Sequence, residues 1–486
     1  MEKNNKKPIL YHGRLPMNRR EMLASGAIPA LTWLTTPTSL LSTFAAAGVA
    51  QAQELCKTGA VDKFPAFINV NCSGGWWACG NWIPLTEGRE LLPSYGRNGL
   101  GSANNLVGMI VKDGHFKNKP PFFSGSGFMA GVQSGLVPNL ASLALAKTNF
   151  VGMPLQSQND TNTNKLSPIS LLQKAGVGGT GILPFFGQQD SITGVNQTPA
   201  FSNPLKAPLL VNNYNSIVNA LGVADRLSAL NHAQKTKMFK ASQALSAVQS
   251  RNLASLTGGS LLDRLLNLAN VDNTKLIENP SGLDLDPRVN TAFSAVWGLN
   301  ANTQPGDRDL VNAATVYNII NGNAGAGGMQ VGGCDYHGSA LGPTIAKDNE
   351  IGTLVGRILQ SLHVMSKPGF IAVTTDGSVG APPSDIPGTD PTADRGDSSA
   401  IYMMYYDPTD SVQAPDWQVG HMKADPNAEA ADDTFLVGGN PEIATAAVIA
   451  NFFAAANKMN SWTSVPELNR TFDSLQLKKI VKFNAA

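Results

Sequence analysis

The segment DNEIGTLVGRILQSLHVMSKPGFIAVT (residues 348–374) decides the fold class. Its apolar residues recur at the i, i+3, i+4, i+7 spacing of one helix face, namely Ile351, Leu354, Val355, Ile358, Leu362 and Met365. This spacing predicts an amphipathic helix over Asp348–Met365. The short apolar run Gly369–Thr374 that follows predicts a buried strand. A helix that leads directly into a buried strand is typical of α/β proteins.

The same alternation extends outward from this segment. Further strands are predicted at Phe64–Cys72, Asn105–Val111, Asn149–Met153, Gln330–Tyr336 and Ser399–Tyr406. Further helices are predicted at Pro138–Lys147, Ser167–Ala175, Asp309–Ile320 and Pro441–Met459. Loops rich in Gly are predicted at Gly322–Gly328 and Gly377–Ser399. We therefore predict a single α/β domain over residues 53–486.

One stretch inside this domain differs in composition from the rest. Residues 223–272 are rich in Ala, Leu, Lys and Gln and nearly lack Pro. This composition favours helix over strand. We predict a helical insertion here, which serves as a lid or as a flank of the sheet.

The first 52 residues have the pattern of an export signal. The segment MNRREMLAS (17–25) carries the pair Arg19-Arg20 ahead of a mildly apolar stretch, and Ala50-Gln51-Ala52 has the small-x-small pattern that signal peptidase reads. The tandem arginine resembles a twin-arginine signal, the route of proteins exported already folded. We predict that the Tat translocase and signal peptidase are partners through residues 17–52, and that the protein is periplasmic or secreted. An ordinary Sec signal or an uncleaved anchor is the alternative.

Charge is scarce and is concentrated in the leader. The chain is 42% hydrophobic and only 15% charged, with a formal net charge of +1. Residues 1–52 hold six basic and two acidic residues, which leaves 30 basic and 33 acidic residues in the remainder, a net charge of −3. The mature chain therefore gives no indication of nucleic-acid binding. It has no apolar run of the length a membrane span requires, so we predict no transmembrane helix after processing.

The four cysteines, Cys56, Cys72, Cys79 and Cys334, leave their chemistry open. In an exported protein an even number allows disulfides, and Cys72 with Cys79 would close a small loop. Zinc is the weaker interpretation, because no Cys-x-x-Cys spacing is present.

The segment GGCDYHGSALGPT (332–344) contains the best candidate for a functional pair. Asp335 and His337 lie two residues apart, so they would share one face if the strand continued through them. At the carboxyl end of a strand they would point into the crevice where α/β proteins bind ligands. Asp376 follows the next predicted strand, and Asp397 lies in the loop before the last one. Asp and His together suit Zn, Mn or Mg. Each of them is equally compatible with an ordinary polar role in a strand end or loop.

Five stretches appear in the order of an exported bacterial family of unknown function, itself similar to the alkaline phosphatase and sulfatase superfamily. They are NCSGGWWACGN (71–81), GGCDYHG (332–338), TTDGS (374–378), DRGDSS (394–399) and LVGGNPEIATAAVIANF (436–452). The resemblance implies an alkaline phosphatase-like fold with a central, mostly parallel sheet flanked by helices. It also implies a site for a divalent metal ion formed by Asp335, His337, Asp376 and Asp397.

The chain departs from that family's pattern at three of the expected ligand positions. Trp77 stands where an early Asp is expected, Ser398 stands where a His is expected, and Asp376 replaces a Glu. Loss of two ligands would remove one of two metals, which leaves one divalent ion as the expected cofactor. No nucleophile can be assigned, and Ser73 is suggested by position alone. Trp76 and Trp77 are interpreted as packing residues or, alternatively, as a stacking surface at the mouth of a pocket.

Two functional hypotheses follow from these observations. The first is an exported metal-dependent hydrolase of phosphate or sulfate esters with a degenerate site. The second is a non-catalytic periplasmic or cell-surface protein that binds a ligand or serves a structural role on the same fold. The sequence leaves the catalytic residues, the substrate and the oligomeric state undetermined.

Overall fold

The computed structural model describes the chain from Phe64 onward, with gaps. The gaps are 113–114, 138–140, 156–167, 178–184, 189–207, 222–233, 235–236, 238–239, 242–243, 245–284, 378, 383, 385–386, 391–392, 395–398, 424–440 and 486. The chain divides into two compact units, residues 63–240 with 273–486 and residues 1–62 with 241–272. The sheet, the helices that cover it and the candidate site all belong to the larger unit. The predicted leader lies outside the described residues.

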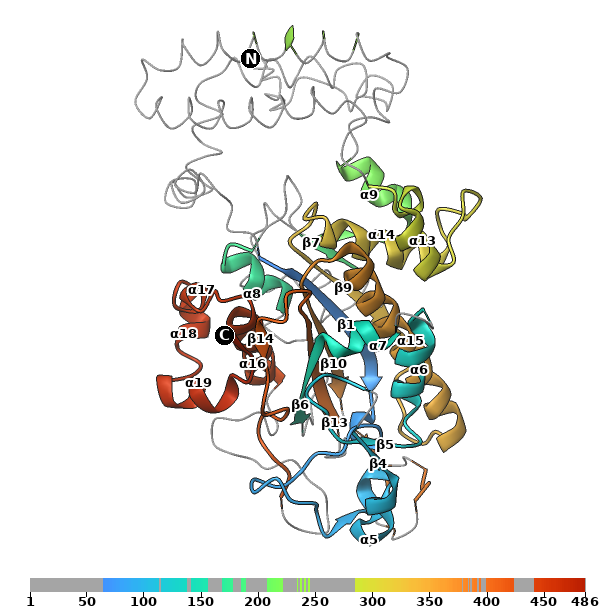
Figure 1. Ribbon diagram of the computed structural model, residues 1–486, viewed down its shortest axis with the longest axis vertical. Coiled ribbons are helices and arrows are strands. Elements are labelled where there is room, and N and C mark those ends of the chain that lie inside the picture. Colours follow the sequence, from blue (N-terminus) through green and yellow to red (C-terminus); the bar gives the residue numbers. More distant parts are fainter. Residues whose placement is uncertain are drawn as a thin grey trace, which may run out of the picture. The chain divides into compact units, whose positions relative to one another are not determined.

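A seven-stranded sheet forms the centre of the larger unit (Figure 1), in the order β6-β13-β10-β1-β9-β7-β8. The strands in this order are Thr148–Leu155, Ser399–Tyr406, Gly369–Gly377, Ala66–Gly75, Ala326–Val331, Phe185–Gly187 and Leu209–Leu210. Strand β13 runs antiparallel to both of its neighbours, and the other pairs are parallel. The predicted α/β class with a mostly parallel central sheet is confirmed.

Helices cover both faces of the sheet (Figure 1). Successive residues of a strand point to opposite sides, and both sides of these strands carry apolar side chains that must be buried. On one face, Ile68 and Val70 of β1 join a hydrophobic cluster with helices α6, α13, α14 and α15. On the other face, Phe67 joins a second cluster with α8 and α16. The helices on the first face are α6 (Gly127–Gly135), α13 (Thr291–Trp297), α14 (Arg308–Ile320) and α15 (Leu341–Met365). Those on the second face are α8 (Pro168–Lys174) and α16 (Pro441–Ala455). Layers of this kind bury the apolar side of every element.

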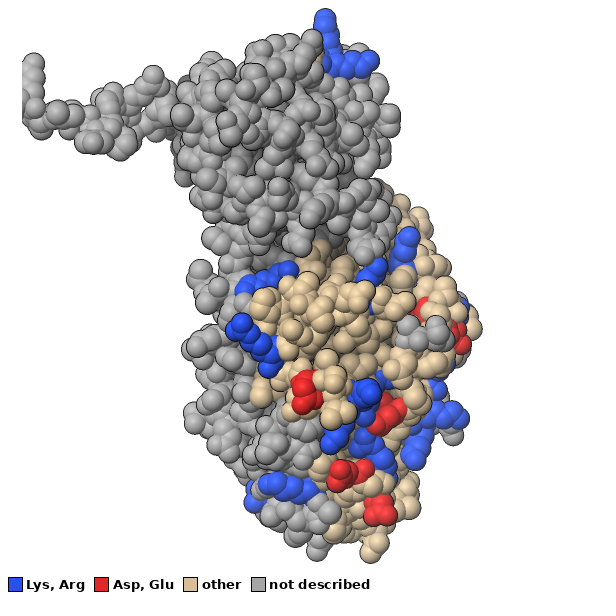
Figure 2. Space-filling model, turned by 90° about the vertical axis from the view of Figure 1, so that its left-hand side faces the viewer, with Lys and Arg blue, Asp and Glu red and all other residues tan. Residues whose placement is uncertain are grey.

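Shorter elements surround this framework. Further α-helices among the described residues are α5 (Ala103–Leu106), α7 (Ala141–Ala146), α9 (Tyr214–Leu221), α17 (Asn460–Thr463), α18 (Pro466–Asn469) and α19 (Ser474–Ile480). Four two-stranded ladders pair β2 (Ser94–Tyr95) with β3 (Gly101–Ser102), β4 (Ile110–Val111) with β5 (Phe122–Phe123), β11 (Val379–Gly380) with β12 (Ala393–Asp394) and β14 (Val412–Gln413) with β15 (Asn484–Ala485). On the face shown in Figure 2, Lys and Arg are interspersed with Asp and Glu over the described part.

Helices α6 and α15 touch backbone to backbone through glycine. A Cβ added at Gly131 would lie 2.2 Å from the carbonyl oxygen of Asn349, and one at Gly352 would lie 2.0 Å from the carbonyl oxygen of Phe128. Real Cβ atoms do not approach an oxygen so closely. The two helices can therefore cross at this separation only because these positions carry no side chain.

The predicted positions of several elements agree closely with the structure. Strand β13 has the predicted limits, and α16 begins at Pro441 as predicted but ends at Ala455, four residues before Met459. Helix α15 ends at Met365 as predicted but begins at Leu341. The residue Pro343 lies in its first turn, where a proline removes no hydrogen bond of the helix.

The predictions around β9 were wrong. This strand covers Ala326–Val331, so part of the predicted Gly322–Gly328 loop is strand, and the predicted strand Gln330–Tyr336 is mostly loop. Gly327 explains the difference, because a Cβ added there would lie 2.6 Å from Cδ1 of Ile319 in α14. The small residues are present because a helix packs directly on the strand, and not because the chain turns.

The prediction of a strand at Asn105–Val111 was also wrong. Helix α5 ends at Leu106, a 3-10 turn covers Val107–Met109, and only the last two residues form β4. Ser102 caps the helix by accepting a hydrogen bond from the N–H of Asn105. Val107 is 59% exposed, so the apolar run that suggested a strand does not enter the core.

The described cysteines do not form disulfides with one another. Cys72, Cys79 and Cys334 are fully buried, and the small loop from Cys72 to Cys79 is not closed by a disulfide. The thiol of Cys79 donates to the carbonyl oxygen of Ser399, and burial raises its pKa well above the ordinary value. Burial thus keeps this thiol protonated and away from oxidants. Cys56 lies outside the described residues.

The predicted insertion at residues 223–272 lies almost entirely outside the described residues. The described positions within it are all helical: Gln234, Lys237, Lys240, Ala241 and Ala244.

Candidate functional site

Three neighbouring parallel strands, β9, β1 and β10, end at one edge of the sheet. Loop residues 332–340, which follow β9, run alongside the end of β1. The N–H of Cys334 donates to the carbonyl oxygen of Ser73 (3.0 Å), and the N–H of Tyr336 donates to that of Gly75 (3.2 Å). The carboxyl edge of a parallel sheet is where α/β proteins bind ligands. The loop that follows β9 is thus held at the position expected for a site.

Gly74 is necessary for this close approach. It has φ +107°, and a Cβ added to it would lie 2.5 Å from the backbone nitrogen of Asp335 and 2.6 Å from its Cβ. A side chain at position 74 would both strain the backbone and displace Asp335. The glycine turn after β1 therefore determines where Asp335 lies.

Asp335 and His337 are brought together as a hydrogen-bonded pair. Nδ1 of His337 lies 2.7 Å from Oδ1 of Asp335, and the side chains are 50% and 54% exposed, respectively. A carboxylate that bonds one ring nitrogen of a histidine fixes the orientation of the ring, as in many metal sites. The pair lies in a loop and not on the predicted strand. Its two side chains are therefore oriented by their mutual hydrogen bond and by the turns at the flanking glycines, and not by the alternation of a strand.

The other two predicted site residues are described only in part. Asp376 belongs to β10, whose Gly377 pairs with Gly75 of β1, so its backbone lies at the same edge; its side chain is outside the described residues. Asp397 is also outside them. Among the residues that the structure describes, no three His, Cys, Asp or Glu side chains form a group that could hold a metal ion.

The tryptophans after β1 are packing residues, as the first interpretation predicted. Trp76 and Trp77 are 0% and 3% exposed. The ring of Trp77 lies against glycine, since a Cβ added at Gly99 would be 2.2 Å from its Cη2. The position where the resembling family has an Asp is therefore inside the core of this chain.

A buried carboxylate beneath the loop was missed by the sequence analysis. Asp348 of α15 accepts hydrogen bonds from Nε1 of Trp76 (2.7 Å), the hydroxyl of Tyr336 (2.8 Å) and Nδ2 of Asn81 (2.8 Å). Burial raises the pKa of the Asp348 carboxyl to about 6, and the hydrogen bonds from its three partners oppose this rise. The sequence does contain a sign that Asp348 is buried. It precedes Ile351 by three residues and therefore lies on the same helix face as the apolar residues.

A second polar chain reaches Ser73 from the side of β9. Nε2 of Gln330 donates to Oγ of Ser73 (2.6 Å), and the N–H of Gln330 donates to Oε1 of Gln188 (2.9 Å). Nε2 of Gln188 in turn donates to Asn312 of α14. These bonds orient the Ser73 hydroxyl at the end of β1.

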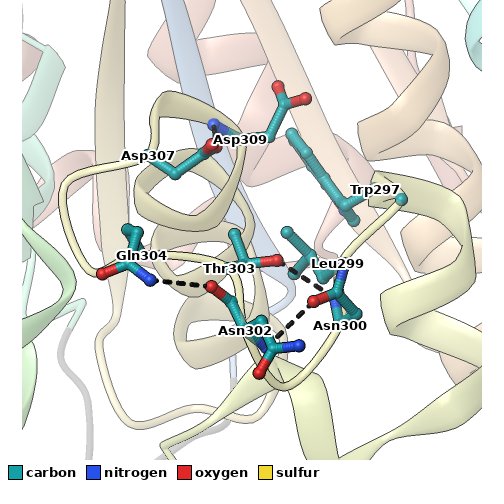
Figure 3. Close-up of a pocket in the computed structure, with 9 residues that line it drawn as sticks. Trp297, Leu299, Asn300, Asn302, Thr303, Gln304, Asp307 and Asp309 are labelled. Carbon is teal, nitrogen blue, oxygen red and sulfur yellow. Dashed lines mark hydrogen bonds between the residues drawn. The ribbon is translucent and has the colours of Figure 1, made fainter.

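A hollow of about 410 Å³ lies elsewhere, between the end of α13 and the start of α14 (Figure 3). Its lining is mostly polar, and the loop Asn300–Gln304 is held by its own hydrogen bonds. Its two carboxylates already have structural partners, because Asp307 caps α14 and Asp309 pairs with Arg357. The hollow is therefore polar, but both of the carboxylates that line it are engaged in contacts within the protein.

The fold defines the chain as an α/β protein with a mostly parallel central sheet, and the Asp335–His337 pair lies in the loop that follows β9 at the carboxyl ends of the central strands. No protein-family model matches the chain, and no match is found among curated proteins or solved structures. Among the described residues, no helix is both long and apolar enough to cross a membrane.

Proposed function

We propose that this chain is an exported hydrolase with an alkaline phosphatase-like fold that uses one divalent metal ion to hydrolyse phosphate or sulfate esters. The observation that carries the proposal is the placement of the Asp335–His337 pair, exposed and hydrogen-bonded, after β9 and beside the end of β1. Carboxylate and imidazole are suitable ligands for Zn and Mn. Asp376 and Asp397 are proposed to complete the site.

The chemistry of the residues accounts for their proposed roles. Asp335 orients the His337 ring and contributes negative charge, which favours a cation at this edge. A bound metal ion would polarise the ester and lower the pKa of a bound water. The carbonyl oxygen of Ser73 accepts from the N–H of Cys334, next to Asp335, and its hydroxyl accepts from Gln330. We propose that this hydroxyl contacts a substrate oxygen.

A second candidate function is non-catalytic ligand binding on the same fold. The specific observation in its favour is the burial of Trp77, which leaves the edge without a carboxylate at the position where the resembling family has one. A site with fewer anionic ligands holds a metal less tightly. This candidate differs from the first in the absence of turnover.

Metal content and ester hydrolysis test the proposal together. We expect the folded protein to bind one Zn²⁺ or Mn²⁺, measured by elemental analysis and calorimetry, and to hydrolyse p-nitrophenyl phosphate or sulfate. Asp335→Asn should weaken metal binding about 10-fold or more. The control is Asp410→Asn, which removes a surface carboxylate paired with Lys117. Absence of metal binding would rule out the hydrolase, whereas binding without turnover would favour the second candidate.

Export by the twin-arginine route is proposed from the leader alone. We expect Arg19→Lys combined with Arg20→Lys to abolish periplasmic delivery, because that route recognises the arginine pair and not its charge. Fractionation of cells that express each variant gives the measurement. Lys6→Arg with Lys7→Arg is the control, since it also preserves charge. Unchanged delivery of the first variant would contradict the twin-arginine route.

A further inference from the structure

The loop that carries the candidate pair is anchored from below by Tyr336. Asp335 and His337 on either side of this residue are exposed, whereas Tyr336 is only 2% exposed. The side chains thus alternate, with the two candidate ligands outward and the tyrosine ring inward. Burial raises the pKa of the Tyr336 hydroxyl well above its ordinary value, so the hydroxyl stays protonated and donates to Asp348 over 2.8 Å.

Two residues of this loop are buried against the rest of the protein. Cys334 and Tyr336 are the two fully buried residues of segment 332–340, and they also make its two backbone hydrogen bonds to the end of β1. Gly333 and Gly338 flank them with φ of +74° and +70°. Glycines of this kind supply the turn geometry but contribute no side-chain contact. Between these two glycines, the Cys334 thiol donates to the carbonyl oxygen of Val331 within the same segment of chain, and the Tyr336 hydroxyl donates to Asp348 of α15.

The same carboxylate also holds the chain on the other side of the site. Asp348 accepts from Trp76, directly after β1, and from Asn81. Oδ1 of Asn81 accepts from Oγ of Ser126 and from the N–H of Phe128, at the start of α6. One residue of α15 thus ties together the end of β1, the start of α6 and the loop that follows β9. A buried network with every donor satisfied is rigid, and loss of one member is felt by the others.

We propose that Asp348 is a positioning residue, which acts through the Tyr336 hydroxyl to hold the loop in the conformation that presents Asp335 and His337 to a ligand. This inference rests on the proposed function only for the identity of that ligand, a divalent metal ion. Asp348 does not touch the ligand itself.

Tyr336→Phe tests the inference because it removes the hydroxyl and keeps the buried ring. We expect faster amide hydrogen exchange in residues 332–340 and a loss of Zn²⁺ or Mn²⁺ affinity of about 10-fold or more, as is typical when a partner behind a metal ligand is removed. Tyr95→Phe is the matched control. It removes a buried tyrosine hydroxyl that donates to the carbonyl oxygen of Pro84 and accepts from the N–H of Leu92, away from the loop. Both measurements are made on folded protein.

The outcomes separate this inference from the proposed function. The positioning role is supported if Tyr336→Phe shows both faster exchange in the loop and weaker metal binding, while Tyr95→Phe changes neither quantity. Unchanged exchange overturns it, as does faster exchange with unchanged metal affinity. If the wild-type protein binds no metal, the proposed function is wrong. In that case, hydrogen exchange of the loop in Tyr336→Phe and Asp348→Asn still tests whether these two residues anchor the loop.

Discussion

Asp348→Ala is expected to lower the free energy of unfolding by about 3 kcal/mol or more, because it leaves three buried donors without an acceptor. The indole N–H of Trp76, the hydroxyl of Tyr336 and the amide of Asn81 all donate to this carboxylate. Denaturant unfolding of the purified protein, followed by tryptophan fluorescence, measures the loss. A change below about 1 kcal/mol would mean that the network relaxes around the missing group.

The pH dependence of stability, compared between the wild type and Asp348→Asn, isolates the titration of this group, because asparagine does not titrate. The folded pKa of about 6 lies above the ordinary value of 3.8, so the folded state binds the proton more tightly. The stability contributed in this way is fully present below about pH 3.8 and is lost as the pH rises through about 6. The stability of the wild type relative to Asp348→Asn should therefore fall by about 2 kcal/mol between pH 4 and pH 7. A difference that grows with pH would show that the hydrogen bonds to the carboxylate outweigh its burial.

Gly352→Ala should destabilise the protein by more than about 3 kcal/mol through the contact of α15 with α6. The new Cβ would lie 2.0 Å from the carbonyl oxygen of Phe128 and 2.8 Å from the backbone nitrogen of Val132. Both atoms are backbone, so relief requires the two helices to move apart along their length. The better helix propensity of alanine, about 1 kcal/mol, does not offset this loss.

Gly342→Ala is the control in the same helix. A Cβ at Gly342 would meet nothing within 4 Å, so this substitution should be neutral or stabilise the protein by up to about 1 kcal/mol. Thermal unfolding of both variants measures the contrast. Similar midpoints for Gly352→Ala and Gly342→Ala would contradict the backbone contact between α6 and α15.

Several elements could be predicted because their signals are local. Burial can be predicted residue by residue from the apolar stripe of α15 and from the uninterrupted apolar runs of β10 and β13. The prediction failed at β9, where Ala326, Gly327 and Gly328 suggested a loop. Small residues indicate a turn or a close contact equally well, and only the position of Ile319 distinguishes the two.

The candidate site was predictable to a similar extent. Asp335 and His337 were identified from their types and spacing, and the structure brings them together. Asp348 was not identified, although a charged residue on an apolar stripe was visible. Its partners Trp76 and Asn81 lie more than 260 residues away in the chain, and a single sequence carries no trace of such pairs.

The sequence by itself determined the α/β class, the most regular elements and the pair of residues that the site is built around. It could do so because periodicity and residue type depend on local burial. The tertiary structure alone decided the strand order, the glycine contact of α6 with α15 and the burial of Trp77. It also decided that one carboxylate ties the site loop to the core. Each of these depends on which distant segments meet, and that is set by the balance of packing over the whole chain.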